Sequence, residues 1–276
     1  MTEQRSVLIS GCSTGIGRCV AEGLKRRGYR VFATARKQND VEELISLGFE
    51  AVQLDLASSA SIRSAVEYAL QKTGGVLYAL FNNGAYGQPG AVEDLTRDVL
   101  REQFEVNLFG AHELANLVIP VMRRQGEGRI IQNSSLLGLV ALKYRGAYNA
   151  TKYALEGLTD TLRMELKGTN IYVSLIEPGP IRSNFRQNSY AAYKRNINKE
   201  NSYYKEVYEL TGKRLQTEGP VVPFTLGPEA VLKKVIHALE SRRPKERYYV
   251  TFPTHLFAYL KRILPVRVMD KILEKI

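Results

Sequence analysis

The sequence predicts an α/β fold in which helices cover both faces of a parallel sheet. Short β-branched or apolar runs alternate with longer segments whose apolar residues recur at helical spacing. This alternation is typical of parallel strands joined by crossover helices. The runs have no polar face, as expected for strands that are buried on both sides. The length of 276 residues fits one large α/β domain or two small ones, and we expect a single domain, residues 1–276.

Seven runs are predicted as strands of a doubly wound sheet. They span residues 6–10, 30–35, 50–56, 76–83, 129–135, 171–178 and 247–252. Residues 226–241 are predicted to form a helix with Pro228 in its first turn. Residues 185–225 are polar and rich in tyrosine, and we interpret them as a partly helical insertion that covers a substrate site. A surface helix pair without a ligand role is the alternative.

The last 24 residues, 253–276, are predicted to form two short amphipathic helices broken at Pro265. On the first of them, an apolar face is expected from Leu256, Leu260, Ile263 and Leu264. Packing on the domain or on a second subunit is the simplest role for this face. Peripheral contact with a membrane surface is the alternative, because Lys261 and Arg262 flank the apolar residues.

The net charge of +11 arises from 39 basic and 28 acidic residues. The basic residues are scattered in small groups, and no zinc spacing or basic helix-turn-helix pattern accompanies them, so we expect no nucleic-acid partner. A solvated surface is the simplest interpretation. A phosphorylated ligand or an anionic membrane surface would also attract such a protein.

The two cysteines, Cys12 and Cys19, are too few for a disulfide framework and indicate a reducing compartment. The N-terminus passes directly into an apolar run, without the pattern of a signal peptide. No stretch approaches 18 uncharged apolar residues. These observations predict a cytoplasmic protein. Its three histidines form no ligand spacing with the cysteines, so no metal site is expected.

A glycine-rich loop follows the first predicted strand. Gly11, Gly15 and Gly17 lie between that strand and the next helix, where glycine allows a tight turn and a close approach of the backbone to a ligand. The helix that follows presents free N–H groups and the positive end of its dipole. Ser13 and Thr14 can add hydroxyl donors. The loop therefore predicts a pyrophosphate-binding site, as in dinucleotide-binding folds.

The end of the second strand predicts which dinucleotide is bound. In many dinucleotide-binding folds an acidic residue at this place binds the adenosine 2′-hydroxyl, but here it holds Arg36, followed by Lys37. A guanidinium pairs with a 2′-phosphate, which a carboxylate would repel. We therefore expect a preference for NADP(H) over NAD(H). Asp55, after the third strand, suits either a contact with the adenine amino group or a turn before the next helix.

The segment "YNATKY" places a phenol one helical turn before an ammonium. Tyr148 and Lys152 are four residues apart and share a helical face, whereas Tyr153 points about 100° away. Tyr144 has the same spacing to Tyr148, but Gly146 between them is where the helix is expected to begin. A nearby ammonium favours the phenolate, and a bound oxidised nicotinamide would add a second positive charge. Tyr148 can then exchange a proton during hydride transfer.

Ser135 ends the fifth predicted strand, thirteen residues before Tyr148. The C-terminal ends of parallel strands line the ligand crevice, so Ser135 can hold the substrate oxygen beside the phenol. Ser134 is the competing candidate, because alternation along the strand puts the two on opposite faces.

With these residues the chain resembles the short-chain dehydrogenase/reductase family over nearly its whole length. The matching motifs occur in order and are "GCSTGIG" (11–17), "LDL" (54–56), "NNGA" (82–85), "VNLFG" (106–110), "NSSLLG" (133–138), "YNATK" (148–152) and "EPGPIRS" (177–183). The resemblance implies a single-domain Rossmann fold of seven strands. It also implies further cofactor contacts from Ile16, Leu56, Asn83, Gly84, Tyr148, Lys152, Pro178, Gly179 and Ile181.

The same resemblance implies a catalytic tetrad of Asn107, Ser135, Tyr148 and Lys152. Tyr148 would act as general acid/base and Ser135 would polarise the carbonyl. Lys152 would bind the nicotinamide ribose and lower the pKa of the phenol, and Asn107 would hold a water in the proton path. By its residue type alone, Asn107 is a polar residue that kinks a long helix. One motif departs from the family: Gly84 and Ala85 stand in the reverse of the usual order.

The chain looks closest to a bacterial branch of oxidoreductases that also resembles retinol and 17β-hydroxysteroid dehydrogenases and NADPH-dependent aldehyde reductases. This branch implies an NADP-dependent enzyme that reduces hydrophobic aldehydes or ketones and forms a homodimer or homotetramer. A non-catalytic NADP(H)-sensing or scaffold protein on the same fold is the alternative, and the presence of both Tyr148 and Lys152 disfavours it.

Overall fold

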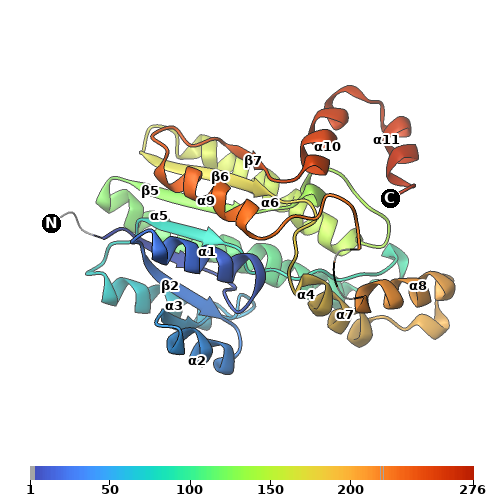
Figure 1. Ribbon diagram of the computed structural model, residues 1–276, viewed down its shortest axis with the longest axis horizontal. Helices are drawn as coiled ribbons and strands as arrows, with labels where there is room; N and C mark the ends of the chain where they lie inside the picture. Colours follow the sequence, from blue (N-terminus) through green and yellow to red (C-terminus); the bar gives the residue numbers. More distant parts are fainter. Residues whose placement is uncertain (1–3, 218, 220) are drawn as a thin grey trace.

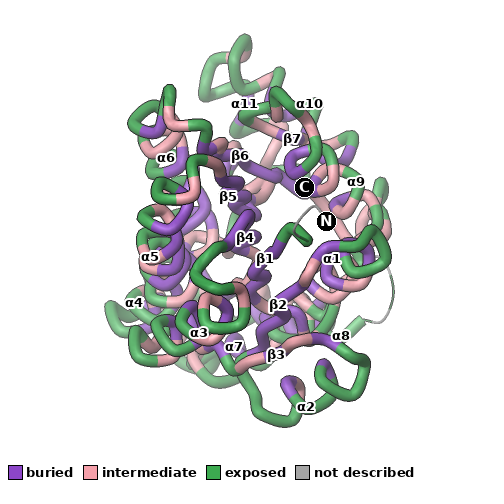
Figure 2. The backbone as a smooth tube through the Cα atoms, turned by 90° about the vertical axis from the view of Figure 1, so that its left-hand side faces the viewer, coloured by how far each residue is buried: buried purple, intermediate pink, exposed green. Residues whose placement is uncertain are grey.

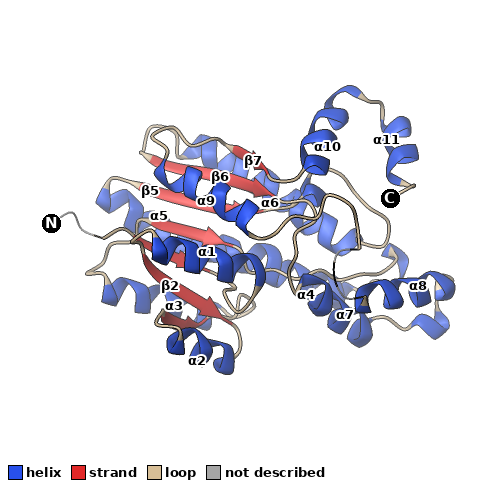
Figure 3. Cartoon of the chain, in the orientation of Figure 1, coloured by secondary structure: helices blue, strands red, loops and turns tan. Residues whose placement is uncertain are grey.

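A seven-stranded parallel sheet forms the centre of the computed structural model, which describes residues 4–217, 219 and 221–276 (Figures 1 and 3). The strands lie side by side in the order β3-β2-β1-β4-β5-β6-β7. Their bounds are Ser6–Ile9 (β1), Arg30–Ala35 (β2), Glu50–Gln53 (β3), Ala79–Asn82 (β4), Gly128–Asn133 (β5), Ile171–Glu177 (β6) and Arg247–Tyr249 (β7). The predicted fold class is confirmed, and all seven predicted strands are present, most of them shorter than expected.

Helices connect the strands and extend the chain beyond them. Their bounds are Gly15–Arg26 (α1), Gln38–Ser46 (α2), Ser59–Lys72 (α3), Arg97–Phe104 (α4), Gly110–Gln125 (α5), Gly146–Glu165 (α6), Phe185–Asn196 (α7), Lys205–Gln216 (α8), Glu229–Glu240 (α9), Phe252–Ile263 (α10) and Val266–Leu273 (α11). A π-helical turn, Glu105–Phe109, joins α4 to α5, and a short 3₁₀ turn, Leu136–Gly138, follows β5.

Two apolar cores lie on opposite faces of the sheet. Alternate residues of one strand enter different cores, as with Val7 on one side and Leu8 on the other. Helices α1, α2 and α9 cover the first core, and α3, α5 and the end of α6 cover the second. Figure 2 shows the two helical layers flanking the buried strands. The absence of a polar strand face in the sequence follows from this burial on both sides.

The insertion at 185–225 contains α7 and α8, which pack on each other beyond the C-terminal ends of the strands (Figure 1). Tyr193 and Tyr208 form the apolar centre of this pair. The Tyr208 hydroxyl accepts a hydrogen bond from the backbone N–H of Ala91 at 2.9 Å and donates to Asp94 at 2.5 Å. These bonds attach the insertion to the loop after β4. We call residues 185–216 the lid helices.

The two C-terminal helices, α10 and α11, form a hairpin (252–273) that packs on the segment after β5. Phe257 and Met269 contact Val140, with Leu260 and Leu264 packed around them. The predicted apolar face of α10 is therefore wrong in part, because Leu256 and Ile263 are exposed. Leu260 and Leu264 are packed as predicted, and Phe257 takes the place expected for Leu256. Within the described residues, no helix has both the length and the hydropathy needed to cross a membrane.

Candidate active site

The glycine-rich loop between β1 and α1 is closely packed against neighbouring backbone. Gly11 and Gly15 have φ angles of +72° and +60°, a conformation that side chains disfavour. A Cβ on Gly17 would lie 2.0 Å from the carbonyl oxygen of Gly11, so the first turn of α1 can approach the loop only with glycine there. The predicted need for glycine at these three positions thus has a steric basis.

The N-terminus of α1 offers free donors for an anion. Thr14 is the N-cap residue, but its hydroxyl makes no capping hydrogen bond, and the first turn of α1 contains no acidic residue. Ser13 lies beside it in the same loop, and Ile16 packs its side chain against the core. The residues therefore fit the pyrophosphate of a dinucleotide, which backbone N–H groups and the helix dipole would hold.

Asn83 connects the loop after β4 to the glycine-rich loop. Its side-chain amide donates to the carbonyl oxygens of Ser10 and Gly11, each at 3.0 Å. The neighbouring Gly84 is closely packed, because a Cβ there would lie 2.8 Å from a methyl group of Leu56, which would have to shift. Ala85 has no positive φ angle. The reversed order of Gly84 and Ala85 is therefore compatible with the local backbone.

The adenosine end of the predicted site lies at the C-terminal end of β2. Arg36 follows this strand and is exposed, and its backbone carbonyl accepts a hydrogen bond from the side chain of Gln53 at 3.0 Å. Asp55 uses one carboxylate oxygen in a turn, accepting from the N–H of Ala57 at 3.0 Å. Arg18, one residue beyond the last loop glycine, pairs with Glu43 on α2. Its position adds a second guanidinium near the start of α2 that the sequence pattern had not singled out.

Helix α6 begins at Gly146, as predicted, and presents Tyr148 and Lys152 on one side. The Lys152 Nζ atom lies 5.6 Å from the centre of the Tyr148 ring. Ser135 has the extended conformation of a capping residue, and its hydroxyl accepts from the N–H of Leu137 at 3.1 Å. The Ser134 hydroxyl is buried and has no hydrogen-bond partner among the described residues. Of the two serines, Ser135 is the one whose hydroxyl acts on the Tyr148 phenol.

Burial controls the ionisation of this pair. It raises the pKa of Tyr148 to about 12, against the smaller opposing effects of the Ser135 hydroxyl and the Arg145 guanidinium. It also lowers the pKa of Lys152 to about 8, which the charge of Glu156 partly offsets. In the protein alone, the phenol is therefore less acidic than a free tyrosine. The groups that oppose this rise in pKa are Ser135 and Arg145, and not Lys152 as expected from the sequence.

A chain of hydrogen bonds links Lys152 to the glycine-rich loop. The Lys152 ammonium donates to the backbone carbonyl of Asn133 at 2.7 Å. The side chain of Asn133 donates to the side-chain oxygen of Asn83 at 3.0 Å, and Asn83 in turn holds the carbonyl of Gly11. Because each partner is a fixed backbone or amide group, the lysine and the loop are positioned by the same network.

Asn107 lies in the π-helical turn between α4 and α5, where a kink was predicted. Its side chain accepts from the N–H of Tyr86 at 3.1 Å and donates to the carbonyl of the same residue at 2.9 Å. It also donates to the hydroxyl of Thr151 at 3.3 Å. Asn107 therefore joins the loop after β4 to α6, next to Lys152.

The segment after β6 crosses from the end of the strand to the glycine-rich loop. The carbonyl of Pro178 accepts from the N–H of Leu136 at 2.7 Å, just after Ser135. Gly179 packs so closely on Thr251 that a Cβ would lie 2.1 Å from its hydroxyl, and Ile181 pairs with Leu226. Pro178 therefore lies beside the segment that follows Ser135, and Ile181 packs on the same core as Ile16 of the first helix.

A small cavity of about 30 Å³ adjoins the phenol. Its walls come from Gly87, Gln88, Pro89, Leu137, Arg145, Tyr148, Phe185 and Ser189. The Phe185 ring, at the start of the lid helices, lies 5.3 Å from the Tyr148 ring, centre to centre. Phe185 and Arg145 were not predicted as site residues, because neither belongs to a motif. The adjacency of Arg145 to the "YNATK" motif was the one available signal.

Three comparisons with known proteins identify the family of this chain. A family model described as short chain dehydrogenase matches residues 5–194. The chain is 46% identical over 271 residues to the uncharacterized oxidoreductase YbbO of Escherichia coli K12, covering 98% of this chain and 94% of the relative. It is 32% identical over 258 residues to human retinol dehydrogenase 8, covering 88% and 80% of the two chains.

A solved structure of a short-chain dehydrogenase from Streptomyces avermitilis has a TM-score of 0.78 and 26% identity, and the match covers 100% of this chain and 98% of the other. The match to the family model covers more than half of the chain. The matched residues include the glycine-rich loop, Ser135, Tyr148 and Lys152. The protein therefore belongs to the short-chain dehydrogenase/reductase family of oxidoreductases, which use a nicotinamide cofactor.

Proposed function

We propose that the protein is an NADP(H)-dependent reductase of hydrophobic aldehydes or ketones. The observation that carries this proposal is the convergence of Ser135, Tyr148 and Lys152 beside a glycine-rich loop that fits a dinucleotide. The bound nicotinamide would supply the hydride. The residues of this chain supply orientation and a proton.

In this proposal, the Ser135 hydroxyl holds the substrate oxygen, and the Tyr148 hydroxyl donates the proton to it. Lys152 holds the nicotinamide ribose, and its charge offsets the negative charge that develops on the phenol. Asn107 holds the loop after β4, at Tyr86, in a fixed position relative to α6. A water held near Asn107 would return the proton to the phenol from solvent. Burial of Tyr148 keeps the phenol protonated until the substrate accepts the proton.

The preference for NADP(H) rests on Arg36. Its guanidinium follows β2 at the edge of the predicted adenosine site, and no described carboxylate pairs with it within 4.0 Å. A free guanidinium at this position favours a 2′-phosphate through charge-assisted hydrogen bonds. Arg18 lies nearby but is already paired with Glu43, so we assign it a supporting role.

The apolar part of the cavity supports a hydrophobic substrate. Pro89, Leu137 and Phe185 line it, and the tyrosine-rich lid helices lie next to it. The similarity to retinol dehydrogenase 8, whose name denotes a long apolar alcohol, points in the same direction. The cavity in this closed arrangement is smaller than such a molecule, so the lid helices must move to admit it.

The direct test measures NADPH consumption by the purified protein against a panel of aldehydes, ketones, retinoids and steroids. We expect turnover of medium- or long-chain aldehydes, and we expect Tyr148→Phe to lose it by a factor of at least ~10². Tyr153→Phe is the matched control, because Tyr153 lies on the same helix and its hydroxyl bonds to the carbonyl of Leu139. Equal turnover by Tyr148→Phe and the unaltered protein would exclude Tyr148 from the reaction.

We also propose that the protein forms a homodimer or homotetramer through α5 and α6. Helix α6 exposes Leu158 and Met164, and Phe109 is exposed just before α5. Light scattering tests this: Leu158→Glu combined with Met164→Glu should give a monomer. An unchanged mass for the double variant would place the interface elsewhere.

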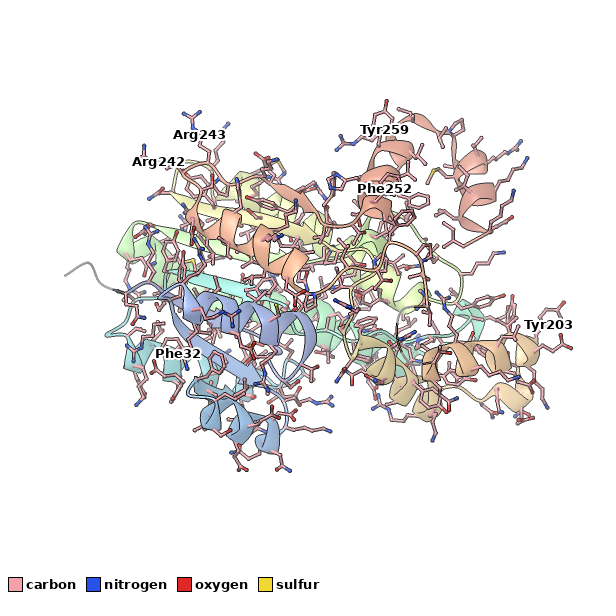
Figure 4. All side chains as sticks on the ribbon, in the orientation of Figure 1. Phe32, Tyr203, Arg242, Arg243, Phe252 and Tyr259 are labelled. Carbon is pink, nitrogen blue, oxygen red and sulfur yellow. The ribbon has the colours of Figure 1, made fainter. Side chains whose placement is uncertain are left out.

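We further propose a cytoplasmic location with peripheral membrane contact through the C-terminal hairpin. Tyr259, Ile263 and Val266 are exposed on it, and Tyr259 points outward from α10 (Figure 4). Lys261 and Arg262 lie among them and would attract anionic lipid. Co-sedimentation with anionic vesicles tests the contact, and Ile263→Glu with Val266→Glu should abolish it. Binding that persists in this variant would contradict the proposal.

A further inference from the structure

Arg145 is held in a fixed position beside the phenol. It is the residue just before α6, and its backbone pairs with Gly90 in the loop after β4. The N–H of Gly90 donates to the carbonyl of Tyr144 at 3.0 Å, and Tyr144 has a φ of +59°, which a tyrosine adopts only under local constraint. The chain thus directs the arginine side chain into the wall of the cavity that contains Tyr148.

The guanidinium of Arg145 lacks a protein partner. Among the described residues, no carboxylate lies within 4.0 Å of it and no side-chain hydrogen bond is formed. Burial lowers the pKa of this guanidinium to about 10, and the charge of Arg214 on α8 acts in the same direction. Arg247, by contrast, is paired with three carboxylates. A partly buried cation without a partner is costly, so Arg145 is poised to gain an anionic ligand.

A second unpaired polar group faces the same cavity. The Ser189 hydroxyl on α7 is buried, with 2% of the residue exposed, and it has no hydrogen-bond partner in the described part of the chain. Native proteins satisfy most buried hydroxyls, so an orphan beside a cavity indicates a missing partner. The two groups come from opposite sides, the start of α6 and the middle of α7. Both residues line this one cavity, so each offers a donor to an anion bound there.

We propose that Arg145 and Ser189 bind a carboxylate of the substrate, so that the substrate class is oxo acids with an apolar body. The inference rests on the proposed reductase function, because the carboxylate is assigned to the same substrate whose carbonyl is reduced. A planar carboxylate matches the fork of a guanidinium and can take a further hydrogen bond from a hydroxyl. Pro89, Leu137 and Phe185 then contact the apolar part.

A competing role for Arg145 must be separated from this one. Its charge also lowers the pKa of Tyr148, so its removal can slow every substrate by making the phenol harder to ionise. A carboxylate-binding residue affects only substrates that carry the carboxylate. The comparison of an oxo acid with its own methyl ester distinguishes the two roles, because the ester keeps the carbonyl and the apolar body.

The first experiment measures kcat/KM with NADPH for aliphatic oxo acids of increasing length and for their methyl esters. The unaltered protein should prefer the acid. Arg145→Gln should lower the ratio of kcat/KM for the acid to kcat/KM for its ester by about 10- to 100-fold, the range expected for a hydrogen bond to a charged group. Lys143→Gln is the matched control, since Lys143 is an exposed cation two residues away. Equal losses for acid and ester would overturn the proposal.

The second experiment needs no turnover. Calorimetry measures binding of the same oxo acids to Tyr148→Phe in the presence of NADPH, with and without Arg145→Gln. Binding that depends on Arg145 supports the carboxylate site even if no carbonyl compound is reduced by the unaltered protein, a result that would sink the reductase function alone. Binding of acid and ester with equal affinity, or no binding of the acid, would overturn the carboxylate site.

Discussion

Phe185 lies edge-on against Tyr148, with the two ring planes at 67°. Phe185 is the first residue of α7, so the insertion places an aromatic side chain directly over the candidate proton donor. Burial is the main cause of the raised pKa of Tyr148. The lid helices therefore help to set the acidity of a residue that belongs to another helix.

Phe185→Ala should lower the pKa of Tyr148, because water reaching the phenol stabilises its charged form. Reduction needs the neutral phenol, so activity falls as pH rises through that pKa. The alkaline limb of kcat/KM should move to lower pH by about one unit. Phe109→Ala, which changes an exposed ring outside the cavity, should leave the limb in place. Superimposable profiles for Phe185→Ala and the unaltered protein would contradict the prediction.

Lys152→Met should stabilise the protein at neutral pH. The pKa of Lys152 falls from 10.5 in the unfolded chain to about 8 in the folded one. Below pH 8 the lysine is charged in both states, and the folded state bears the full cost of the buried ammonium. Between pH 8 and 10.5 the unfolded chain binds more protons than the folded protein. The free energy of unfolding of the unaltered protein therefore rises with pH in this range. The gain from the substitution should reach about 3 kcal/mol at neutral pH and vanish above pH 10.5.

Urea unfolding at a series of pH values measures this difference. Lys143→Met is the control, since Lys143 is exposed and its removal should change stability little at any pH. A gap between Lys152→Met and the unaltered protein that stays constant with pH would show that another interaction of the lysine, such as its bond to Asn133, dominates.

Arg36→Asp should reverse the preference between the two dinucleotides. The carboxylate repels a 2′-phosphate and can accept a hydrogen bond from a 2′-hydroxyl. We expect the Kd for NADPH to rise by at least ~10-fold and the Kd for NADH to fall, as measured by quenching of protein fluorescence. Lys37→Asp, at the next exposed position, tests for a general charge effect. If the Kd for NADPH is unchanged and the Kd for NADH does not fall, Arg36 does not bind the 2′-phosphate.

Gly17→Ala should abolish dinucleotide binding and destabilise the protein. The new methyl group would meet the carbonyl oxygen of Gly11 at 2.0 Å, and the loop cannot yield without losing its bonds to Asn83. Gly157→Ala is the opposite case, since nothing lies within 4 Å of its Cβ position in α6. This second change should raise the free energy of unfolding by roughly 0.5–1 kcal/mol. Retained NADPH affinity in Gly17→Ala would refute the steric argument.

Arg247→Met should destabilise the protein by about 3–5 kcal/mol, because it leaves buried carboxylates without a counter-charge. Arg247 on β7 bonds to Glu177 at 2.5 Å and to Asp160 at 2.6 Å, and it also pairs with Glu156. Arg101→Met is the control, since its pair with Asp98 is exposed and is worth less than ~1 kcal/mol. Equal losses in thermal or urea unfolding would show that the buried cluster contributes no more than a surface pair.

The alternation of apolar runs and helical segments was sufficient to predict the fold. The inner strands β1, β4 and β5 are buried along their whole length, so their hydrophobic runs record that burial directly. The strand ends were predicted less well: Leu77 and Tyr78 are buried but precede β4 in the loop, and periodicity cannot separate a buried loop from a strand. The start of α6 was predicted because Gly146 gives a local signal.

The parts of the site that escaped prediction are contacts between distant segments. Phe185 meets Tyr148 only because the insertion folds back over α6, and no spacing in the sequence encodes that contact. Asp55 was left open between an adenine contact and a turn; the structure shows the turn, with the second carboxylate oxygen still available. On α10, Leu260 was predicted to pack but Phe257 was not, because the packed face depends on the position of Val140 and not on α10 alone.

The packing of Phe257 and Met269 on Val140 couples the hairpin 252–273 to the reaction centre. Val140 lies a few residues beyond Ser135, so the hairpin supplies apolar backing to the segment that begins at this serine. A surface or a partner that drew the hairpin away would uncover Val140 and loosen that segment. Occupancy of the hairpin would then be felt at Ser135.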